Sequence, residues 1–314
     1  MRKFWIVAAT LLLGGCAPRY VMSPPLSLGD HAQPEHSVTR HIVLVSIDGL
    51  RPDAIETYGA STLQRLMREG SYTLAASTIT PSKTLPSHTS MLTGQPPDRH
   101  HVLWNNVATA KSALIETPTV FSVARSKGYS TAAFFSKSKF HPLQRPGTLD
   151  YSQAPGGWFG RWSSERTVTD VEAHLGSARP NVLFVHLSDP DRAGHQDGWM
   201  SAEYGRAVRT TDVALARLLL AAERAYGATN FSMIVTADHG GHDRDHGSDD
   251  PRDVTIPWIA WGRGVEPGQL LGPSVRTMDT AATLLWLLGI PEPADWFGSP
   301  VLAAFSRGAD RAGL

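Results

Sequence analysis

A dense cluster of carboxylate and imidazole side chains follows an apolar run at residues 231–235. The stretch TADHGGHDRDHGSDDP, residues 236–251, places five aspartates and three histidines between Asp238 and Asp250. Like charges held close together and out of water repel one another and are poorly solvated, so the cluster is costly unless a positive charge lies among them. A metal ion is the simplest candidate. Convergent Asp and His favour a divalent ion, with zinc the first choice where imidazoles abound.

Two other apolar runs also end in acidic residues. HIVLVSI, residues 41–47, is followed by Asp48 and a glycine, and NVLFVHL, residues 181–187, by Ser-Asp-Pro-Asp. Asp191 and His195 are four residues apart, so a turn or the start of a helix would carry both side chains to one side. Asp189 is the alternative to Asp191, but it lacks this spacing. Asp48 with its glycine is also compatible with a simple turn.

A fourth segment offers a nucleophile. The stretch TPSKTLPSHTSMLTG, residues 80–94, places Thr84 at or near the start of a helical stretch, where amide donors and the helix dipole favour an anion. A threonine there can act as a nucleophile once a metal lowers the cost of forming its alkoxide. The simpler alternatives are that Thr84 only caps the helix and that His246, in the opening cluster, is a solvated loop histidine.

These residues need a scaffold that brings them together. Short apolar runs rich in Val, Ile and Phe recur and predict strands, at residues 41–47, 130–135, 181–187, 231–236 and 256–261. Helical patterns lie between them, at residues 61–70, 117–128, 163–176, 201–227 and 276–289, most of them closed by glycine. The alternation predicts an α/β fold, a three-layer sandwich around a mostly parallel sheet. The carboxyl ends of its strands would form one ligand-binding edge, where the acidic residues converge.

Five motifs occur together in this chain: SIDGLRPD, PSKTLPSHTSMLTG, DPDRAGH, TADHGGH and DHGSDD. In this order they resemble the alkaline phosphatase superfamily, and within it the nucleotide pyrophosphatase/phosphodiesterase branch, from about residue 41 to 290. The resemblance implies an alkaline phosphatase-like fold and a pair of divalent metal ions, most simply Zn²⁺. One ion would be held by Asp48, Thr84, Asp238 and His239, and the other by Asp191, His195 and His246. Asn105 matches the position at which the family places an amide against a phosphoryl oxygen.

This ligand set suits phosphoryl chemistry. Two cations about 4 Å apart can clamp the attacking and leaving oxygens of an in-line displacement at phosphorus. Thr84 would attack and form a phosphothreonine, from which water releases the product, while Asn105 and backbone amides near Thr84 stabilise the charge. We therefore predict a metal-dependent phosphoric ester hydrolase, similar to phosphodiesterases and nucleotide pyrophosphatases. Its substrate would be a small-molecule phosphate ester or a nucleotide, although Leu85 and His101 stand where nucleotide-cleaving relatives carry Phe and Gly.

Other functions on the same core remain open. A phosphomonoesterase, a phosphonate hydrolase or an envelope phospho-group transferase could use the same residues. A sulfatase with a formylglycine nucleophile is unexpected, because residues 84–88 read TLPSH and lack the convertible Cys or Ser at the first position. A lipoprotein that binds metal without turnover is less expected than an enzyme, since all seven proposed ligand positions are present.

The N-terminal residues predict export and lipid attachment. MRKFWIVAATLLLGGC begins with two cations and an apolar stretch too short for a comfortable membrane span, and it ends in the only cysteine, Cys16. Residues 1–15 read as a lipoprotein signal peptide, 16–38 as the lipidated Cys and a flexible tether, 39–306 as the catalytic domain and 307–314 as a tail. The alternative is an ordinary secretory signal. The expected location is the bacterial cell envelope, anchored to a membrane by the lipid at the outer membrane or periplasmic face.

The overall charge argues against one class of partner. The chain has 29 Lys and Arg against 29 Asp and Glu. Nucleic-acid binding proteins show a basic surplus, so no nucleic-acid partner is expected.

Overall fold

The computed structural model describes residues 37–106, 109, 114–157 and 160–306. The predicted signal peptide, Cys16, nearly all of the tether and the C-terminal tail therefore lie outside the described residues. Within the described ranges, no helix combines the length and apolarity needed to cross a bilayer.

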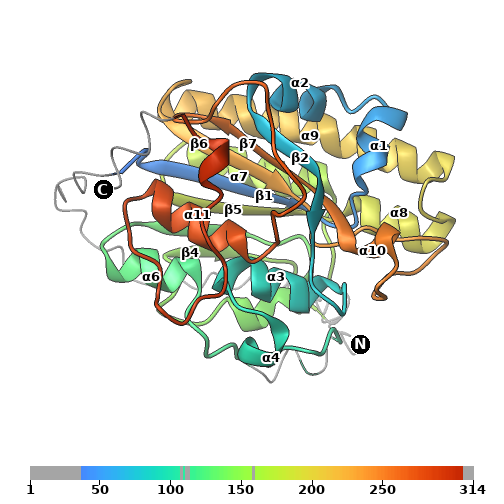
Figure 1. Cartoon of the computed structure of the whole chain (residues 1–314), viewed down its shortest axis with the longest axis horizontal. Helices are drawn as coiled ribbons and strands as arrows, with labels where there is room; N and C mark the ends of the chain where they lie inside the picture. Colours follow the sequence, from blue (N-terminus) through green and yellow to red (C-terminus); the bar gives the residue numbers. More distant parts are fainter. Residues whose placement is uncertain (1–36, 107–108, 110–113, 158–159, 307–314) are drawn as a thin grey trace, which may run out of the picture.

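A mixed sheet of eight strands forms the centre of the described chain, in the order β4-β3-β5-β1-β6-β7-β2-β8 (Figure 1). Its strands are β1 (His41–Ile47), β2 (Ser71–Ser77), β3 (Thr131–Phe134), β4 (Tyr151–Gln153), β5 (Val182–Leu187), β6 (Phe231–Thr236), β7 (Thr255–Gly262) and β8 (Gln269–Leu270). Only β7 runs against its neighbours β6 and β2, and the other neighbouring pairs are parallel. The prediction of a mostly parallel sheet is confirmed, and all five predicted strands are present.

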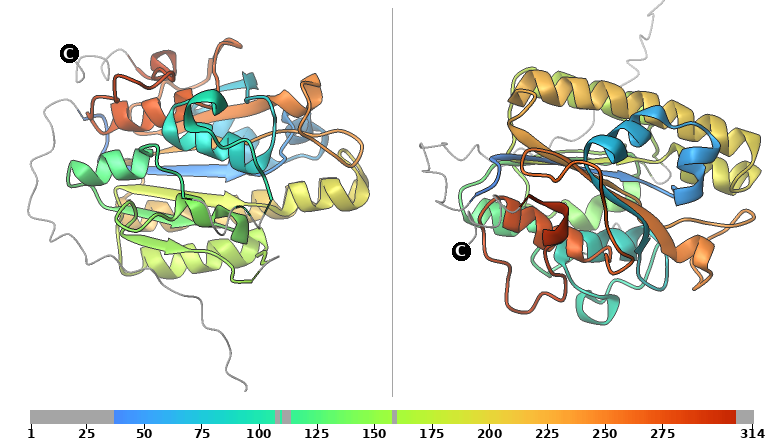
Figure 2. Two further views of the ribbon diagram at one scale, coloured as in Figure 1. Left: turned by 90° about the horizontal axis from the view of Figure 1, so that it is seen from below. Right: turned by 45° about the horizontal axis from the view of Figure 1, so that its top comes forward.

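Helices cover both faces of the sheet and complete three layers (Figures 1 and 2). One face carries α1 (Pro52–Thr57), α2 (Ser61–Glu69), α7 (Ser164–Leu175), α8 (Asp189–Asp197) and α9 (Ala202–Tyr226). The other carries α3 (Thr84–Thr93), α4 (Pro97–His100), α6 (Val120–Ser126), the 3-10 helix η1 (Ser138–Leu143) and α11 (Asp279–Leu287). The short α10 (Pro251–Val254) and the 3-10 helix η2 (Leu302–Ala304) lie in connections. The predicted layered α/β architecture is confirmed.

The central strands explain how distant acidic residues meet. β1, β5 and β6 are Val-, Ile- and Leu-rich runs that are buried along almost their whole length, as expected for strands covered on both faces. β1 pairs in parallel with β5 on one side and β6 on the other, with Ser46 opposite both His186 and Thr236. The three strands therefore end side by side, and the residues that follow them share one edge of the sheet.

Helix α3 brings the predicted nucleophile to this edge. It begins at Thr84, as predicted, and every residue in it is buried. The hydroxyls of Thr89 and Thr93 donate to the carbonyls of Leu85 and Thr89, both at 2.7 Å, so these polar side chains are satisfied inside the core. The helix ends at Gly94, whose φ of 63° is left-handed.

Candidate active site

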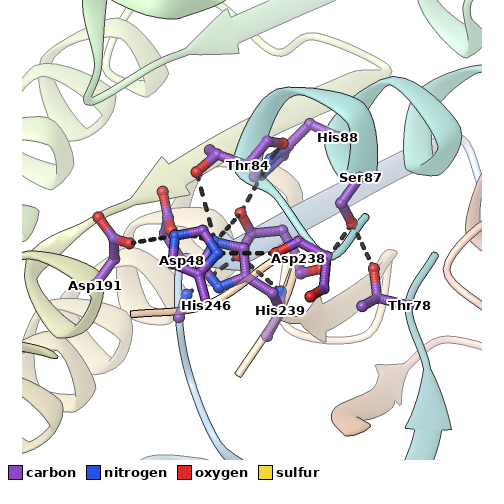
Figure 3. Close-up of polar contacts among 12 residues, drawn as sticks. Asp48, Thr78, Thr84, Ser87, His88, Asp191, Asp238, His239 and His246 are labelled. Carbon is purple, nitrogen blue, oxygen red and sulfur yellow. Dashed lines mark hydrogen bonds and ion pairs between the residues drawn. The ribbon is translucent and has the colours of Figure 1, made fainter. Parts of the chain in front are cut away.

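The predicted ligands converge at the carboxyl edge of the sheet, next to the N-terminus of α3 (Figure 3). Asp48 follows β1, Asp191 lies in the first turn of α8, which follows β5, and Asp238 and His239 follow β6. All of these residues and Thr84 are at most 1% exposed. His246 comes from the loop before α10 and His195 from α8, and the His195 side chain is 39% exposed. The sequence set is thus assembled around Thr84 rather than dispersed.

One group of ligand atoms surrounds the ring of His239. Its Nε2 lies 3.4 Å from Asp48 Oδ1, 3.3 Å from Asp238 Oδ2 and 3.4 Å from Thr84 Oγ1. These are the four residues that the resemblance assigns to one metal ion. Asp48, Asp238 and His239 offer ligand atoms that all lie within 4.8 Å of one another.

A second group forms around Asp191. Its Oδ1 lies 3.3 Å from His195 Nε2 and 3.7 Å from His246 Nε2, and the i, i+4 placement on α8 brings Asp191 and His195 together as predicted. A compact alternative triad joins Asp191 and His246 with His239, again within 4.8 Å. We place His239 in the first group, where its Nε2 faces two carboxylates and Thr84, and His195 in the second, because it lies closer to Asp191 Oδ1 than His246 does.

The three carboxylates each leave one oxygen without a partner. Asp48 Oδ1, Asp191 Oδ1 and Asp238 Oδ2 are buried and accept no hydrogen bond from the residues that the structure describes. The other oxygen of each is held, for example Asp238 Oδ1 by the amides of Gly49 at 3.1 Å and His239 at 3.0 Å. An unsatisfied buried charged oxygen is strongly unfavourable. Three such oxygens directed at the imidazoles fit a site for cations.

The imidazoles are oriented by the backbone. Nδ1 of His195 lies 3.0 Å from the carbonyl of Arg244, that of His239 2.8 Å from the carbonyl of Gly240, and that of His246 2.8 Å from the carbonyl of Ser82. A carbonyl oxygen only accepts, so each Nδ1 carries the proton. In the neutral ring Nε2 then presents its lone pair to the site, as metal-ligating histidines do.

The electrostatics of the site are those of crowded, buried acids. Burial, followed by repulsion from Asp48, raises the pKa of Asp238 well above its ordinary value. Burial opposes ionisation of Asp48 too, but the ammonium of Lys137 and a hydrogen bond from His186 outweigh it and hold its pKa well below the usual range. Burial lowers the pKa of His239, and it lowers that of His246 to about 3. The rings are therefore neutral at pH 7, which is the form that binds metal.

Comparison with known proteins identifies the family of this chain. A profile of the family described as type I phosphodiesterase / nucleotide pyrophosphatase matches residues 42–252. The chain belongs to this family. Membership of this family places the chain in the alkaline phosphatase superfamily, as the five motifs predict.

Individual members of the type I phosphodiesterase family are distant. GPI ethanolamine phosphate transferase 1 of Candida glabrata is 24% identical over 316 residues, which cover 84% of this chain and 33% of the relative. Human ectonucleotide pyrophosphatase/phosphodiesterase family member 1 is 23% identical over 252 residues, 70% of this chain and 26% of the relative. The chain thus spans a third or less of the length of these two curated relatives.

A solved structure carries the same fold. Inactive murine ectonucleotide pyrophosphatase/phosphodiesterase 5, in complex with AMP, superimposes with a TM-score of 0.69 at 16% identity. The match covers 85% of this chain and 100% of that chain. At this identity the likeness establishes the fold alone.

A buried lysine that no sequence motif marks joins the two ligand groups. Lys137 Nζ contacts Asp48 Oδ2 and lies 2.6 Å from Asp191 Oδ2, with the residue 3% exposed. It holds the oxygens that do not face the imidazoles. Lys137 lies three residues after β3, at the same strand edge as the acids, so its place along the chain is a signal, but its contact with the acids follows only from the fold.

Asn105 lies beside the N-terminal turn of α3, where it contacts the residue after Thr84. Its Oδ1 accepts hydrogen bonds from the amide of Leu85 at 3.0 Å and from Lys139 Nζ at 3.3 Å. The amide next to Thr84, expected to be a free donor, is therefore engaged by Asn105. Because both bonds use Oδ1, the amide NH₂ of Asn105 is the group that remains to donate to a phosphoryl oxygen.

Neighbouring histidines support the ligands from behind. His186 Nε2 lies 3.0 Å from Asp48 Oδ2, and its Nδ1 lies 2.7 Å from Ser136 Oγ. His88 Nδ1 lies 2.7 Å from the carbonyl of Thr84. Both histidines are buried against the site, and neither belongs to the predicted ligand set.

The remaining acids of the opening cluster do not reach the site. Asp243, Asp245 and Asp249 are exposed. Asp189, the alternative to Asp191, accepts from the amide of Ser164 and from Arg192 instead of facing the imidazoles. Asp253, which no sequence motif marked, is fully buried and holds the loop that carries His246.

Proposed function

We propose that this protein is an exported, lipid-anchored hydrolase of phosphoric esters that uses Thr84 as its nucleophile and two divalent cations, most simply Zn²⁺. The observation that carries the proposal is the set of three buried carboxylate oxygens without hydrogen-bond partners, next to the Thr84 hydroxyl and the imidazole Nε2 atoms. Phosphodiesters and nucleotide-type anhydrides are the substrates that the family name suggests.

The residues present fit two cations in the arrangement that the family resemblance implies. Asp48, Thr84, Asp238 and His239 would hold one cation, and Asp191, His195 and His246 the other. Two divalent cations, when bound, would ease deprotonation of the Thr84 hydroxyl and neutralise charge on the phosphoryl group. The carboxylate oxygens already engaged by Lys137 and by backbone amides would keep the ligands in place.

The chain's own residues then account for the displacement. Thr84 Oγ1 releases its proton to solvent and attacks phosphorus, the bond from phosphorus to the leaving oxygen breaks, and that oxygen takes up a proton from solvent. Asn105 donates its NH₂ to a non-bridging phosphoryl oxygen, at the positive end of α3. Water then attacks the phosphorus of the phosphothreonine, and the bond from phosphorus to Thr84 Oγ1 breaks. One proton of the water goes to Thr84 Oγ1, and the phosphate or phosphate monoester is released. In this proposal the substrate phosphorus would lie between Thr84 and Asn105.

A phospho-group transferase is the second candidate. The observation that favours it is the similarity to a GPI ethanolamine phosphate transferase over 84% of the chain. The two functions share the attack by Thr84 and differ only in whether water or an acceptor hydroxyl takes the phosphoryl group.

The decisive experiment combines activity with trapping. The full chain, purified in detergent, is assayed with and without chelator against phosphate monoesters, diesters, nucleotides, phosphonates and sulfate esters. We expect chelator-sensitive release of a phosphate-containing product, a loss of at least about 10³-fold in Thr84→Ala, and partial activity in Thr84→Ser. A phosphorylated Thr84 peptide in acid-quenched wild type would identify the nucleophile. Full metal-dependent activity in Thr84→Ala would overturn the assignment.

Lipid attachment at Cys16 and location in the bacterial envelope are part of the same proposal and rest on the leader sequence. Labelled fatty acid should enter the wild-type chain in a diderm host and not Cys16→Ala. Label that persists in this variant would contradict the lipid anchor without affecting the proposed chemistry.

A further inference from the structure

Lys139 places a second ammonium group beside the predicted phosphoryl site. It lies on η1, two residues after Lys137, and its Nζ is 3.3 Å from Asn105 Oδ1. The same oxygen accepts from the amide of Leu85, the residue after Thr84. Lys139 is therefore one hydrogen bond away from the group that we expect to contact a phosphoryl oxygen.

The charge of Lys139 has no counterpart nearby. Its neighbour Lys137 is paired with two carboxylates, whereas no carboxylate among the described residues lies within 4.0 Å of Lys139 Nζ. Burial, reinforced by repulsion from Lys137, lowers the pKa of Lys139 to about 8. A partly buried ammonium without an acid is unfavourable in the free protein. An anion that enters the site with the substrate would relieve this cost.

The charge balance of the site indicates what that anion carries. With two divalent cations bound, the carboxylates of Asp48, Asp191 and Asp238 and the deprotonated Thr84 would bring four negative charges, against four positive charges of the cations and two of the ammoniums of Lys137 and Lys139. Among these groups the loaded site would therefore carry a surplus of two positive charges. A phosphodiester brings a single negative charge, but a phosphate monoester or a phosphoanhydride brings two or more. The surplus of positive charge in the site favours the substrate group with the larger negative charge.

We propose that Lys139 is a specificity-determining residue, which binds a phosphoryl oxygen and selects substrates that bring at least two negative charges to the site. The second charge comes either from the phosphorus under attack, as in a monoester, or from the adjoining phosphorus, as in an anhydride. This inference rests on the proposed function of the same site, and it names the charge of the substrate.

The test compares substrates that differ in charge. Wild type, Lys139→Met and Lys139→Arg are assayed with p-nitrophenyl phosphate, bis-p-nitrophenyl phosphate and ADP, and Lys127→Met serves as the control at an exposed lysine. We expect Lys139→Met to lower the kcat/KM ratio of monoester or anhydride to diester by about 10- to 100-fold, the size of a charge-assisted hydrogen bond. Lys139→Arg should restore most of the ratio, and Lys127→Met should leave it unchanged. If only the ratio of monoester to diester falls, the second charge lies on the phosphorus under attack. If only the ratio of ADP to diester falls, it lies on the adjoining phosphorus.

A binding measurement separates this inference from the proposed function. Inorganic phosphate is titrated calorimetrically into zinc-loaded Thr84→Ala and into the double variant with Lys139→Met. Binding weakened by about 10-fold or more in the double variant supports the inference, even if turnover is not found. Equal phosphate affinity in both, or equal losses of kcat/KM for all three substrates, would overturn the role of Lys139 and leave the proposed function standing. Wild type inactive on every phosphate ester would count against the proposed function alone.

Discussion

His239 and His246 stack their imidazole rings face to face, with centroids 3.6 Å apart and planes inclined by 10°. The two rings belong to different ligand groups, and each is anchored at Nδ1 to a backbone carbonyl. The two cation positions must therefore be immediate neighbours. Stacked rings at this distance also tolerate protonation poorly, because two imidazolium groups would repel each other.

This stacking leads to a pH prediction for the metal-free protein. The pKa of His246 is lowered to about 3 by burial and by His239, while the unfolded chain has an ordinary histidine value near 6.5. The unfolded state therefore binds more protons between these pH values. The contribution of neutral His246 to the stability of the fold is fully present above pH 6.5 and is lost as the pH falls toward 3. His246→Asn should reduce the slope of the unfolding free energy by up to about 1.4 kcal/mol per pH unit in this window.

Chemical denaturation in chelator, at intervals from pH 7 to pH 4.5, measures that slope. The control is His174→Asn, because His174 packs on Tyr151, far along the chain from the ligand loops. Its pKa is also lowered by burial, so His174→Asn should flatten the slope as well, but unlike His246→Asn it should leave zinc binding unchanged. An unchanged slope in His246→Asn would contradict the prediction.

Metal binding should stabilise the fold. Three buried carboxylate oxygens lack partners in the described chain, so a ligand that binds only the folded state relieves this cost. At a free zinc concentration about 100 times the dissociation constant, the gain is about 2.7 kcal/mol per independent site. Thermal unfolding with chelator, and then with increasing zinc, measures this gain. A melting temperature that does not respond to zinc would argue that the oxygens are not cation ligands.

Lys137 should contribute most to the stability of the fold when metal is absent. Its ammonium is the buried cation that Asp48 and Asp191 share, so Lys137→Met leaves two buried carboxylates without a counterion. Removing one partner from such a group costs about 3 to 5 kcal/mol. Bound divalent cations would neutralise the same carboxylates, so the loss should be smaller in saturating zinc.

Denaturant unfolding of wild type and Lys137→Met, each with chelator and with zinc, gives the four free energies needed. Lys127→Met, at an exposed position, controls for loss of a lysine as such. The same destabilisation with and without zinc would mean that Lys137 supports the fold independently of the cation site.

The sequence predicted those parts of the molecule that depend on local pattern. The five apolar runs became strands, and their acidic ends met because parallel neighbours terminate together. The sequence does not predict β2, because SYTLAAS has no apolar run and no strict alternation. Its residues Ser71 and Thr73 are buried polar groups. It becomes a strand through antiparallel pairing with β7, a contact between segments far apart in the chain. Such pairing depends on tertiary context.

The same distinction applies to the candidate site. The metal-ligating Asp and His residues could be predicted from the motifs, because clusters of these residues at strand ends are typical of metal sites. Lys137 and His186 could not, because their importance comes from a contact with Asp48 across the sheet. Sequence separations of 89 and 138 residues divide these pairs. Only the packed fold shows that two acids already share a built-in cation.

Asp253 provides the last prediction, because it controls the second ligand group without touching it. Its Oδ2 accepts from the amides of Gly247 and Ser248, both at 3.1 Å, and its Oδ1 lies 2.7 Å from His242 Nδ1. These bonds fix the loop immediately after His246. Asp253→Asn replaces an acceptor with a donor and weakens this anchor, so His246 should lose its position.

We expect Asp253→Asn to weaken binding of one zinc ion by about 10- to 100-fold, the usual effect of changing a group that orients ligands. Asp250→Asn is the matched control, since Asp250 lies in the same loop and pairs with Arg252 at the surface. Zinc titration of both variants by calorimetry or by a competing chromophoric chelator counts the ions bound tightly. The prediction requires one tight ion in Asp253→Asn and two in Asp250→Asn, because Asp253 orients His246 and no ligand of the first group. Loss of both ions together would show instead that the stacked His239 and His246 bind as one unit, in which displacement of one ring displaces the other.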